Sequence, residues 1–351
     1  MTSIAQMTLT DKIGQLFLMG FDGIDEATTT TFCEQLSRYC PCGVILFDYD
    51  VAHQKPGRNI QSPDQLRSLI SMLQSKASVP LLVGIDQEGG AVQRLRTGQG
   101  FLESKSHQEL GLMNDPERTG QEIQALVHQL KELGITLNFA PVVDIAPLNK
   151  ASMIGARGRS FGSDAQHVSD HAVAYSRAHL EGGVIPCAKH FPGHGSSADD
   201  SHLGFVDVSN TWHPDELQPY RSLIEANLCP MIMSAHIFLS RYDKQLPATL
   251  SQSILRGLLR KELNFEGVII SDDIQMKAIS DHFSLKETIE LGLIAGLDLF
   301  CVGNNLSSEH ISLQACVERT HELVADGAIT EQRIDESVHR ILSLKHQVGL
   351  V

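Results

Sequence analysis

The sequence has no run of lysine and arginine residues, and its 351 residues carry a formal net charge of −14. A protein that binds nucleic acid needs a basic face opposite the phosphates, so we do not expect nucleic acid as a partner. No apolar segment approaches the roughly 18–20 residues that cross a bilayer. The N-terminal residues 1–7 lack the basic stretch and apolar core of a signal peptide. We therefore expect a cytoplasmic protein with no membrane partner.

The cysteines do not form a disulfide framework or a metal-binding pattern. There are seven of them, an odd number, scattered along the chain. Cys40 and Cys42 are one residue too close for a C-x-x-C pair, and no second pair answers them. Cysteines 187, 229 and 301 stand in apolar runs, where free thiols behave as small hydrophobic side chains. This usage favours a reducing compartment.

Short apolar runs recur along the chain and predict buried strands. Most are rich in Val, Ile, Leu and Phe without alternation, which is typical of parallel strands covered on both faces. The runs span residues 15–20, 44–47, 81–85, 137–143, 184–190, 231–235, 268–270 and 297–302.

The segments between these runs have the start signals and periodicity of helices. Ser62, Pro63 and Gln65 supply an N-cap, a proline at the first helical position and a capping-box residue. Similar helices are predicted over 164–180, 214–227 and 251–263. Eight strand–helix units indicate a single (β/α)₈ barrel over residues 1–351, with helices after about 305 completing the outer layer. A doubly wound sheet is the alternative, but no G-x-G-x-x-G turn follows a strand.

Polar and charged residues gather where the predicted strands end. A barrel carries its chemistry at the carboxyl ends of its strands, so these residues predict one polar pocket. They are Asp86 and Arg94 after the third strand, Asp144 after the fourth, Lys189 and His190 at the fifth, His236 at the sixth, and Asp272 and Asp273 at the seventh.

Some of these residues have structural alternatives. Next to Asp86, the pair Gly89-Gly90 suggests close approach of the backbone to a ligand. Asp144 could be a cap or the partner of an arginine, and His236 could simply form hydrogen bonds within the barrel mouth. Because neighbouring residues of a strand point to opposite faces, one of Asp272 and Asp273 would face the pocket. The other would face the helices or cap the next helix.

The segment after the fifth strand is the most densely titratable part of the chain. Lys189–Gly195 is followed by Asp199, Asp200 and His202, which places a lysine, three histidines and two carboxylates around glycine turns. Such a loop after a buried strand indicates an enzyme active site. A metal-dependent hydrolase could use His190, His194, His202 and the two aspartates as ligands, but the paired histidines expected at an early strand end are absent.

Several of these motifs resemble glycoside hydrolase family 3, and specifically its β-N-acetylhexosaminidase branch. They match in order and spacing between about residues 10 and 305. The matching segments are 84–90, 92–94, 138–144, 159–162, 189–195, 200–202 and 271–276.

The resemblance implies a (β/α)₈ glycosidase with a retaining, two-step mechanism. Asp272 matches the family's nucleophile. His202, held by Asp200, would donate a proton to the leaving oxygen and then take one from water. A histidine suits both tasks because it titrates near neutral pH, and a bonded aspartate raises its basicity.

The resemblance also implies a binding set for the hydroxyls of a terminal N-acetylglucosamine, with cell-wall (anhydro-muropeptide) fragments as substrates. No cofactor and no metal are implied, and we expect a monomer whose only partner is the carbohydrate. The matching residues are Asp86, Arg94, Arg159, Lys189 and His190.

The match has two departures. Ala91 stands where the family commonly has an arginine, which bears on the leaving-group side of the site. Arg157 stands close to Arg159, but Arg159 adjoins the Ser160-Phe161-Gly162 element and is the expected ligand. Two alternatives remain open: phosphate instead of water as the acceptor, which would make a phosphorylase, and a sugar-binding barrel without catalysis.

Overall fold

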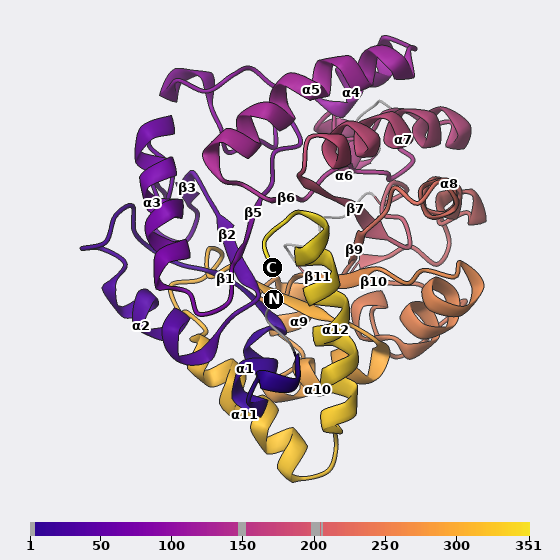
Figure 1. Ribbon diagram of the computed structural model, residues 1–351. Helices are drawn as coiled ribbons and strands as arrows, with labels where there is room; N and C mark the ends of the chain where they lie inside the picture. The colour runs from indigo at the N-terminus through magenta and orange to yellow at the C-terminus, as the bar shows by residue number, and fades with distance from the viewer. Residues whose placement is uncertain (1–3, 147–151, 198–203, 205) are drawn as a thin grey trace.

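The computed structural model describes residues 4–146, 152–197, 204 and 206–351. Eight parallel strands form a closed barrel in the order β1-β12-β11-β9-β7-β6-β5-β2, with helices around it (Figure 1). The predicted (β/α)₈ fold is therefore confirmed. The barrel strands are β1 (Phe17–Gly20), β2 (Gly43–Leu46), β5 (Leu82–Ile85), β6 (Leu137–Asn138), β7 (Ile185–Phe191), β9 (Met231–Ser234), β11 (Val268–Asp273) and β12 (Leu299–Val302).

Each of the eight predicted runs overlaps one barrel strand, but the fourth strand is much shorter than predicted. Strand β6 ends at Asn138, although the apolar run continues to residue 143. Pro141 has no N–H to donate to a ladder, and the Ala140 N–H turns back to the carbonyl of Asn138 at 2.8 Å. The chain stays hydrogen-bonded to β7, whose Cys187 N–H donates to the carbonyl of Ala140 at 2.9 Å, and it pairs with β7 again at an isolated bridge between Val142 and Lys189. The predicted strand over 137–143 was therefore wrong in length.

The outer layer consists mainly of helices with side-chain caps. Ser62 accepts from the N–H of Gln65 at 3.3 Å and starts α3, as predicted. The longer helices are α2 (Thr30–Tyr39), α3 (Pro63–Lys76), α5 (Pro116–Leu133), α7 (Ala165–Glu181), α8 (Gln218–Glu225), α10 (Leu285–Ala295), α11 (Leu313–Ala325) and α12 (Glu331–Gln347). Within the described ranges, no helix is long and apolar enough to cross a membrane.

Two predicted helices differ in detail from the structure. The segment predicted over 214–227 consists of the 3₁₀ turn η3 (Pro214–Leu217) followed by α8. The segment predicted over 251–263 is η5 (Ser253–Glu262), which has the wider hydrogen-bond pattern of a π-helix. Apolar periodicity marks the buried face of a helix but does not separate i+3, i+4 and i+5 bonding, so it could not predict these types.

Helix α12 closes the end of the barrel at which the strands begin (Figure 1). Its Ile341 and Leu344 belong to the same buried cluster as apolar side chains of the strands, such as Leu82 and Leu137. The next residue, Lys345, is fully buried and donates to Oε1 of Gln15 at 2.8 Å. With this end filled by side chains, ligand access is left to the opposite end.

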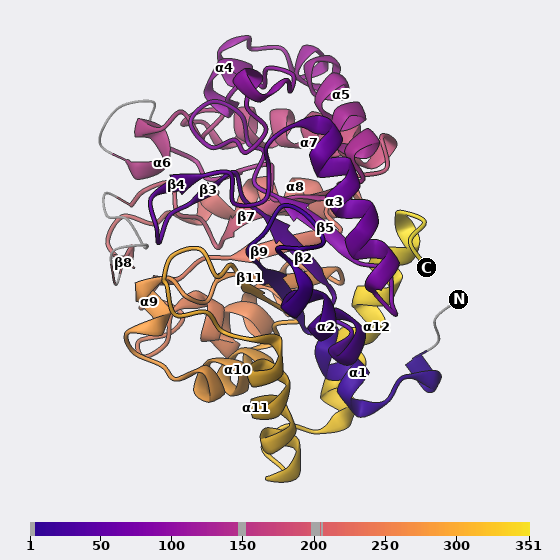
Figure 2. The same ribbon diagram turned by 90° about the vertical axis from the view of Figure 1, so that its left-hand side faces the viewer.

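The opposite end carries several short elements of the chain. Figure 2 shows α6 (Met153–Ala156), α9 (Lys277–Ser280) and the small strands β3 (Tyr49–Asp50), β4 (Lys55–Pro56) and β8 (Val206–Asp207) on the side away from α12. They follow the carboxyl ends of barrel strands, where loop variation creates function in this fold.

The start of β12 is tied to the outer layer by one buried carboxylate. Asp298 is fully buried; its Oδ2 accepts from the N–H of Ile269 at 3.0 Å and from Arg260 at 2.6 Å. Its Oδ1 accepts from Ser337 at 2.8 Å and from Arg340 at 3.0 Å. This carboxylate therefore joins β11, β12, η5 and α12.

We predict that Asp298→Ala lowers the free energy of unfolding by about 3–5 kcal/mol, because it leaves a mostly buried Arg260 without its counter-charge. The exposed carboxylate of Asp326, which pairs with Lys286 at 3.0 Å, gives a matched control. Asp326→Ala should cost about 0–1 kcal/mol. Denaturant unfolding measures both, and equal losses in the two variants would contradict the role given to Asp298.

Candidate active site

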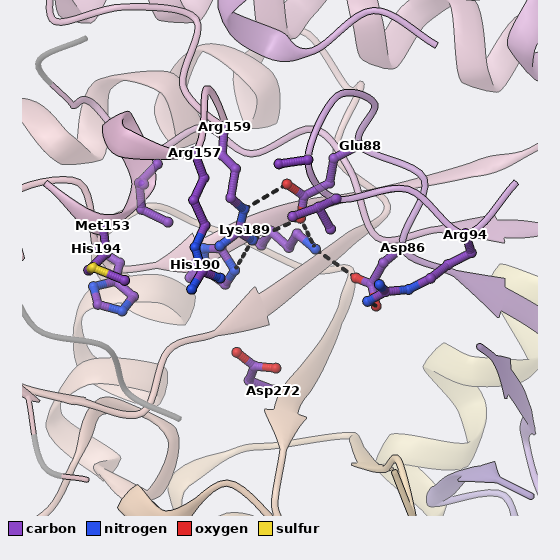
Figure 3. Close-up of a pocket in the computed structure, with 13 residues that line it drawn as sticks. Asp86, Glu88, Arg94, Met153, Arg157, Arg159, Lys189, His190, His194 and Asp272 are labelled. Atoms are coloured by element: carbon purple, nitrogen blue, oxygen red, sulfur yellow. Dashed lines mark hydrogen bonds and ion pairs between the residues drawn. The ribbon is translucent and has the colours of Figure 1, made fainter. Parts of the chain in front are cut away.

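A polar cavity of about 260 Å³ opens at the carboxyl ends of the strands (Figure 3). It brings together residues at or after the carboxyl ends of β5, β6, β7 and β11, as the sequence predicts for one pocket. The lining residues are Asp86, Glu88, Ala91, Val92, Arg94, Met153, Ile154, Arg157, Arg159, Lys189, His190, His194 and Asp272.

The carboxylate of Glu88 holds two cations along one wall of this cavity. It accepts from Nε and Nη2 of Arg159, both at 2.8 Å, in the two-pronged geometry that suits a guanidinium. It also pairs with Nζ of Lys189 at 2.7 Å. Lys189 in turn donates to Asp86 at 2.8 Å, and Asp86 pairs with Arg94 at 3.3 Å. Figure 3 shows these side chains as one connected set.

These charges keep one another ionised despite their burial. Burial alone would raise the pKa of Glu88, but the cations of Arg159 and Lys189 outweigh it and hold that pKa well below its usual range. Burial likewise acts to raise the pKa of Asp86, and Lys189 and Arg94 lower it. Burial acts to lower the pKa of Lys189, yet Asp86 and Glu88 raise it. The wall thus presents fixed charges of both signs.

His190 is oriented by a second buried carboxylate, that of Asp144. Nδ1 of His190 lies 2.7 Å from Oδ2 of Asp144, and Oδ1 accepts from the N–H of His194 at 2.7 Å. Since an ionised carboxylate only accepts, this contact assigns the proton of His190 to Nδ1. Nε2 then accepts from Arg159 at 3.3 Å. Asp144 is therefore neither a helix cap nor an arginine partner, the two alternatives that its sequence position suggested.

Lys189 and His190 both line the cavity although they are neighbours on β7. The register between β7 and β9 shifts between Ala188 and Phe191, which interrupts the alternation of side chains. Both residues therefore reach the site, whereas the strand pattern alone would send one of them elsewhere.

Asp272 and Asp273 have different hydrogen-bond partners, but the expected division between pocket and helices is incomplete, because both line a second cavity together with Asp86 and Arg94. Asp272 faces the cavity from β11, across from the wall of charged residues (Figure 3). Its Oδ1 accepts from the N–H of Asp273 at 2.8 Å. Asp273 instead accepts from the N–H groups of Gln275 and Gly303, both at 3.1 Å, and so ties the end of β11 to the end of β12.

Two other sequence-based interpretations can be judged from the structure. A Cβ on Gly89 would lie 2.0 Å from the carbonyl oxygen of Lys105, and one on Gly90 would lie 2.6 Å from Cβ of Ser106. The glycine pair therefore makes room for other residues of the chain itself, and the expected approach to a ligand stays a prediction. His236 bonds to Thr249 at 2.8 Å and to the carbonyl of Asp273 at 3.0 Å, which is the structural alternative.

The predicted acid/base residues Asp200 and His202 lie outside the described residues, as does Asp199. Within the described ranges, no group of three or more His, Cys, Asp or Glu side chains is arranged to hold a metal ion. The sequence interpretation gave no role to Glu88, although it stands two residues after Asp86 at the same strand end. That spacing was the available signal, because it places a second carboxylate at the predicted pocket.

We predict that Glu88→Gln destabilises the protein in a pH-dependent way. A carboxylate whose pKa is lowered by folding stabilises the native state above its unfolded pKa of about 4.3, and this stability is lost as the pH falls toward the lowered value. The loss in free energy of unfolding caused by the substitution should therefore be largest near pH 7 and become smaller in acid. Denaturant unfolding at several pH values measures it, with the exposed Glu103→Gln as control. A deficit that does not change with pH would contradict the ion-pair role.

Comparison with known proteins places the chain in a family. The model of the glycosyl hydrolase family 3 N-terminal domain matches residues 8–344. A β-hexosaminidase of Haemophilus influenzae is 35% identical over 281 residues, which is 77% of this chain and 75% of that protein. The β-hexosaminidase LpqI of Mycobacterium tuberculosis is 34% identical over 79% of this chain and 71% of its own length.

Solved structures agree with the sequence relatives. The family 3 β-N-acetylglucosaminidase of Paenibacillus sp. superposes with a TM-score of 0.88 at 34% identity, covering 98% of this chain. This chain spans 63% of the length of that structure, so the larger protein contains further regions. On these matches and on the fold, the chain belongs to glycosyl hydrolase family 3 and is a glycoside hydrolase.

Proposed function

We propose that this enzyme is a retaining exo-β-N-acetylglucosaminidase that releases terminal N-acetyl-β-D-glucosamine from cell-wall (anhydro-muropeptide) fragments. The observation that carries the proposal is the position of the Asp272 carboxylate, which faces a wall of charged hydrogen-bonding side chains across a cavity of about 260 Å³. Ligand pockets commonly span roughly 300–1,000 Å³, so this small polar cavity suits a single sugar ring. The names of the relatives, β-hexosaminidase and β-N-acetylglucosaminidase, support the choice of sugar.

In the first step, an oxygen of Asp272 attacks the anomeric carbon as the bond to the leaving oxygen breaks. His202 gives its proton to that oxygen, and a covalent glycosyl-enzyme forms. In the second step, His202 takes a proton from water, the water oxygen attacks the same carbon, and the bond to Asp272 breaks. Two inversions retain the β configuration. Asp200 acts by holding the imidazole of His202.

The charged wall binds the sugar in this proposal. The carboxylate of Asp86 can accept from sugar hydroxyls, while Arg94, Arg159 and Lys189 can donate to their oxygens. Nε2 of His190 faces the same space. Because Glu88 and Asp144 fix these side chains beforehand, substrate binding needs little reordering of the protein, which favours a productive geometry.

We propose that the described chain acts as one catalytic domain, as a cytoplasmic monomer, with α11 and α12 part of the outer layer. All seven cysteines are free thiols, which supports a reducing compartment. A role in recycling cell-wall material fits such a compartment. Profiling with muropeptides, chitobiose and aryl glucosides would define the natural substrate, and an assay for sugar 1-phosphate would identify any transfer to phosphate.

We predict that Asp272→Asn lowers the turnover of aryl N-acetyl-β-glucosaminides by roughly three orders of magnitude or more, because the amide cannot form the glycosyl ester. The variant should keep its fold, since Asp272 is partly exposed at the cavity. Exposed Asp281→Asn serves as the matched control. A folded Asp272→Asn variant with a near-normal rate would show that another group is the nucleophile.

We predict that His202→Ala slows substrates with poor leaving groups by about a hundredfold or more in kcat/KM but spares activated aryl substrates, which need little protonation. The measurement is a series of aryl N-acetyl-β-glucosaminides of decreasing leaving-group acidity. Exposed His213→Ala should leave the whole series unchanged. Equal losses on good and poor leaving groups would argue against proton donation by His202.

A further inference from the structure

The turn after β7 is held by two buried carboxylates that come from different parts of the chain. Asp144 accepts from the N–H of His194 at 2.7 Å. Glu216, in η3, accepts from the next N–H, that of Gly195, at 3.2 Å through Oε2. Glu216 is only 4% exposed, although it plays no part in the sugar site described above. Two consecutive backbone N–H groups of this turn therefore each donate a hydrogen bond to a buried carboxylate.

The turn also packs tightly against the side chain of Glu216. A Cβ on Gly193, whose φ is +118°, would lie 2.4 Å from Oε2 and 2.6 Å from Cβ of Glu216. On the other side, a Cβ on Gly195 would lie 2.0 Å from the carbonyl oxygen of Ile145. The carbonyl of Pro192 accepts from Nε1 of Trp212 at 2.9 Å. Contacts on several sides therefore determine the path of residues 192–195.

This turn carries part of the cavity wall. His194 lines the cavity directly, and His190 is held by the same Asp144 carboxylate that binds the N–H of His194. A displacement of the turn would move His194 and disturb the hydrogen bonds that orient His190. Glu216 has no contact with the cavity of its own, so any effect on the reaction must pass through these residues.

We propose that Glu216 is a positioning residue: its carboxyl group fixes the turn at residues 193–195 and, through that turn, the imidazoles of His190 and His194 beside the substrate. The proposal rests on the function proposed above for the same site. If Glu216 were only structural, its substitution would change stability alone. As a positioning residue, it makes the reaction rate depend on whether its carboxyl group is protonated.

The charge state of Glu216 differs from that of Asp144. Burial, with a smaller contribution from the nearby Asp144 carboxylate, raises the pKa of Glu216 to about 8, and the N–H of Gly195 only partly offsets this. The other titratable groups that face this region are the imidazole of His190, which bonds to Asp144, the imidazole of His194, and the buried phenol of Tyr220 from α8. At neutral pH Glu216 is a neutral acid, and at alkaline pH it becomes a second buried anion near Asp144. Ionisation would strengthen the bond from the N–H of Gly195 but would place a second anion near the Asp144 carboxylate, and we expect this repulsion to displace the turn.

The experiment compares wild type, Glu216→Gln and Glu216→Ala in pH profiles of kcat/KM. A dinitrophenyl N-acetyl-β-glucosaminide is the substrate, because a highly activated leaving group makes proton donation by His202 unimportant. Glu216→Gln keeps an acceptor for the N–H of Gly195 but cannot ionise. Exposed Asp215→Asn, at the adjacent position, is the matched control and should follow the wild-type profile.

We expect Glu216→Gln to remain within about threefold of wild type at pH 7 and to keep its activity about one pH unit or more further into the alkaline range. Glu216→Ala should lose about tenfold or more at every pH, because the turn loses its acceptor. An alkaline limb that is the same in wild type and Glu216→Gln would overturn the proposal. So would a folded Glu216→Gln variant that is as inactive as Glu216→Ala.

A readout without substrate separates this proposal from the proposed function. A carboxyl group whose pKa is raised by folding stabilises the native state fully below its unfolded pKa of about 4.3, and this contribution is lost as the pH rises through 8. Glu216→Gln should therefore gain stability relative to wild type between about pH 4.5 and 8. A constant difference would overturn the neutral-acid assignment, whatever substrate the enzyme turns over.

Discussion

The buried carboxylate of Glu88 is the constraint on which the site depends. It binds Arg159 and Lys189 at 2.7–2.8 Å, and without it two cations would stand in a nearly water-free wall with only Asp86 to balance them. Charges buried in this way are stable only as a complete set. The geometry of the wall is consequently fixed before a substrate arrives, and Asp144 extends the same principle to His190.

One end of the barrel contributes mainly to stability, and the other end holds the residues of the candidate active site. At the end closed by α12, Asp298 joins strands to helices, and apolar side chains of α12 fill the opening. At the other end, strand ends bring together charged residues from segments far apart in the sequence, such as Glu88 and Arg159, 71 residues apart. Because the barrel is rigid, the segments at its open end can hold polar groups in fixed positions, which an isolated loop could not do.

Much of this arrangement was predictable from sequence, because strand ends in a barrel share one face. Strand ends alone predicted a pocket near Asp86, Lys189, His190 and one of Asp272 and Asp273, the family resemblance selected Asp272, and the structure brings these residues together. The sequence could not predict which side chains pair with each other. From its position Asp144 could have paired with an arginine, but it bonds to His190. The glycine pair at 89–90 suggested close approach to a ligand, whereas in the structure both glycines make room for neighbouring residues of the chain itself. The apolar pattern also extended β6 beyond Asn138, where the strand ends.

The central claim is that Asp272 receives the glycosyl group from the substrate. The most direct test incubates the enzyme with a fluorinated N-acetylglucosaminyl fluoride, which forms the glycosyl-enzyme quickly and releases it slowly, and then maps the label by peptide mass spectrometry. The account predicts one adduct, on the peptide that contains Asp272 and at that residue. An adduct on Asp86 or Glu88, or complete turnover with no covalent species under trapping conditions, would contradict it.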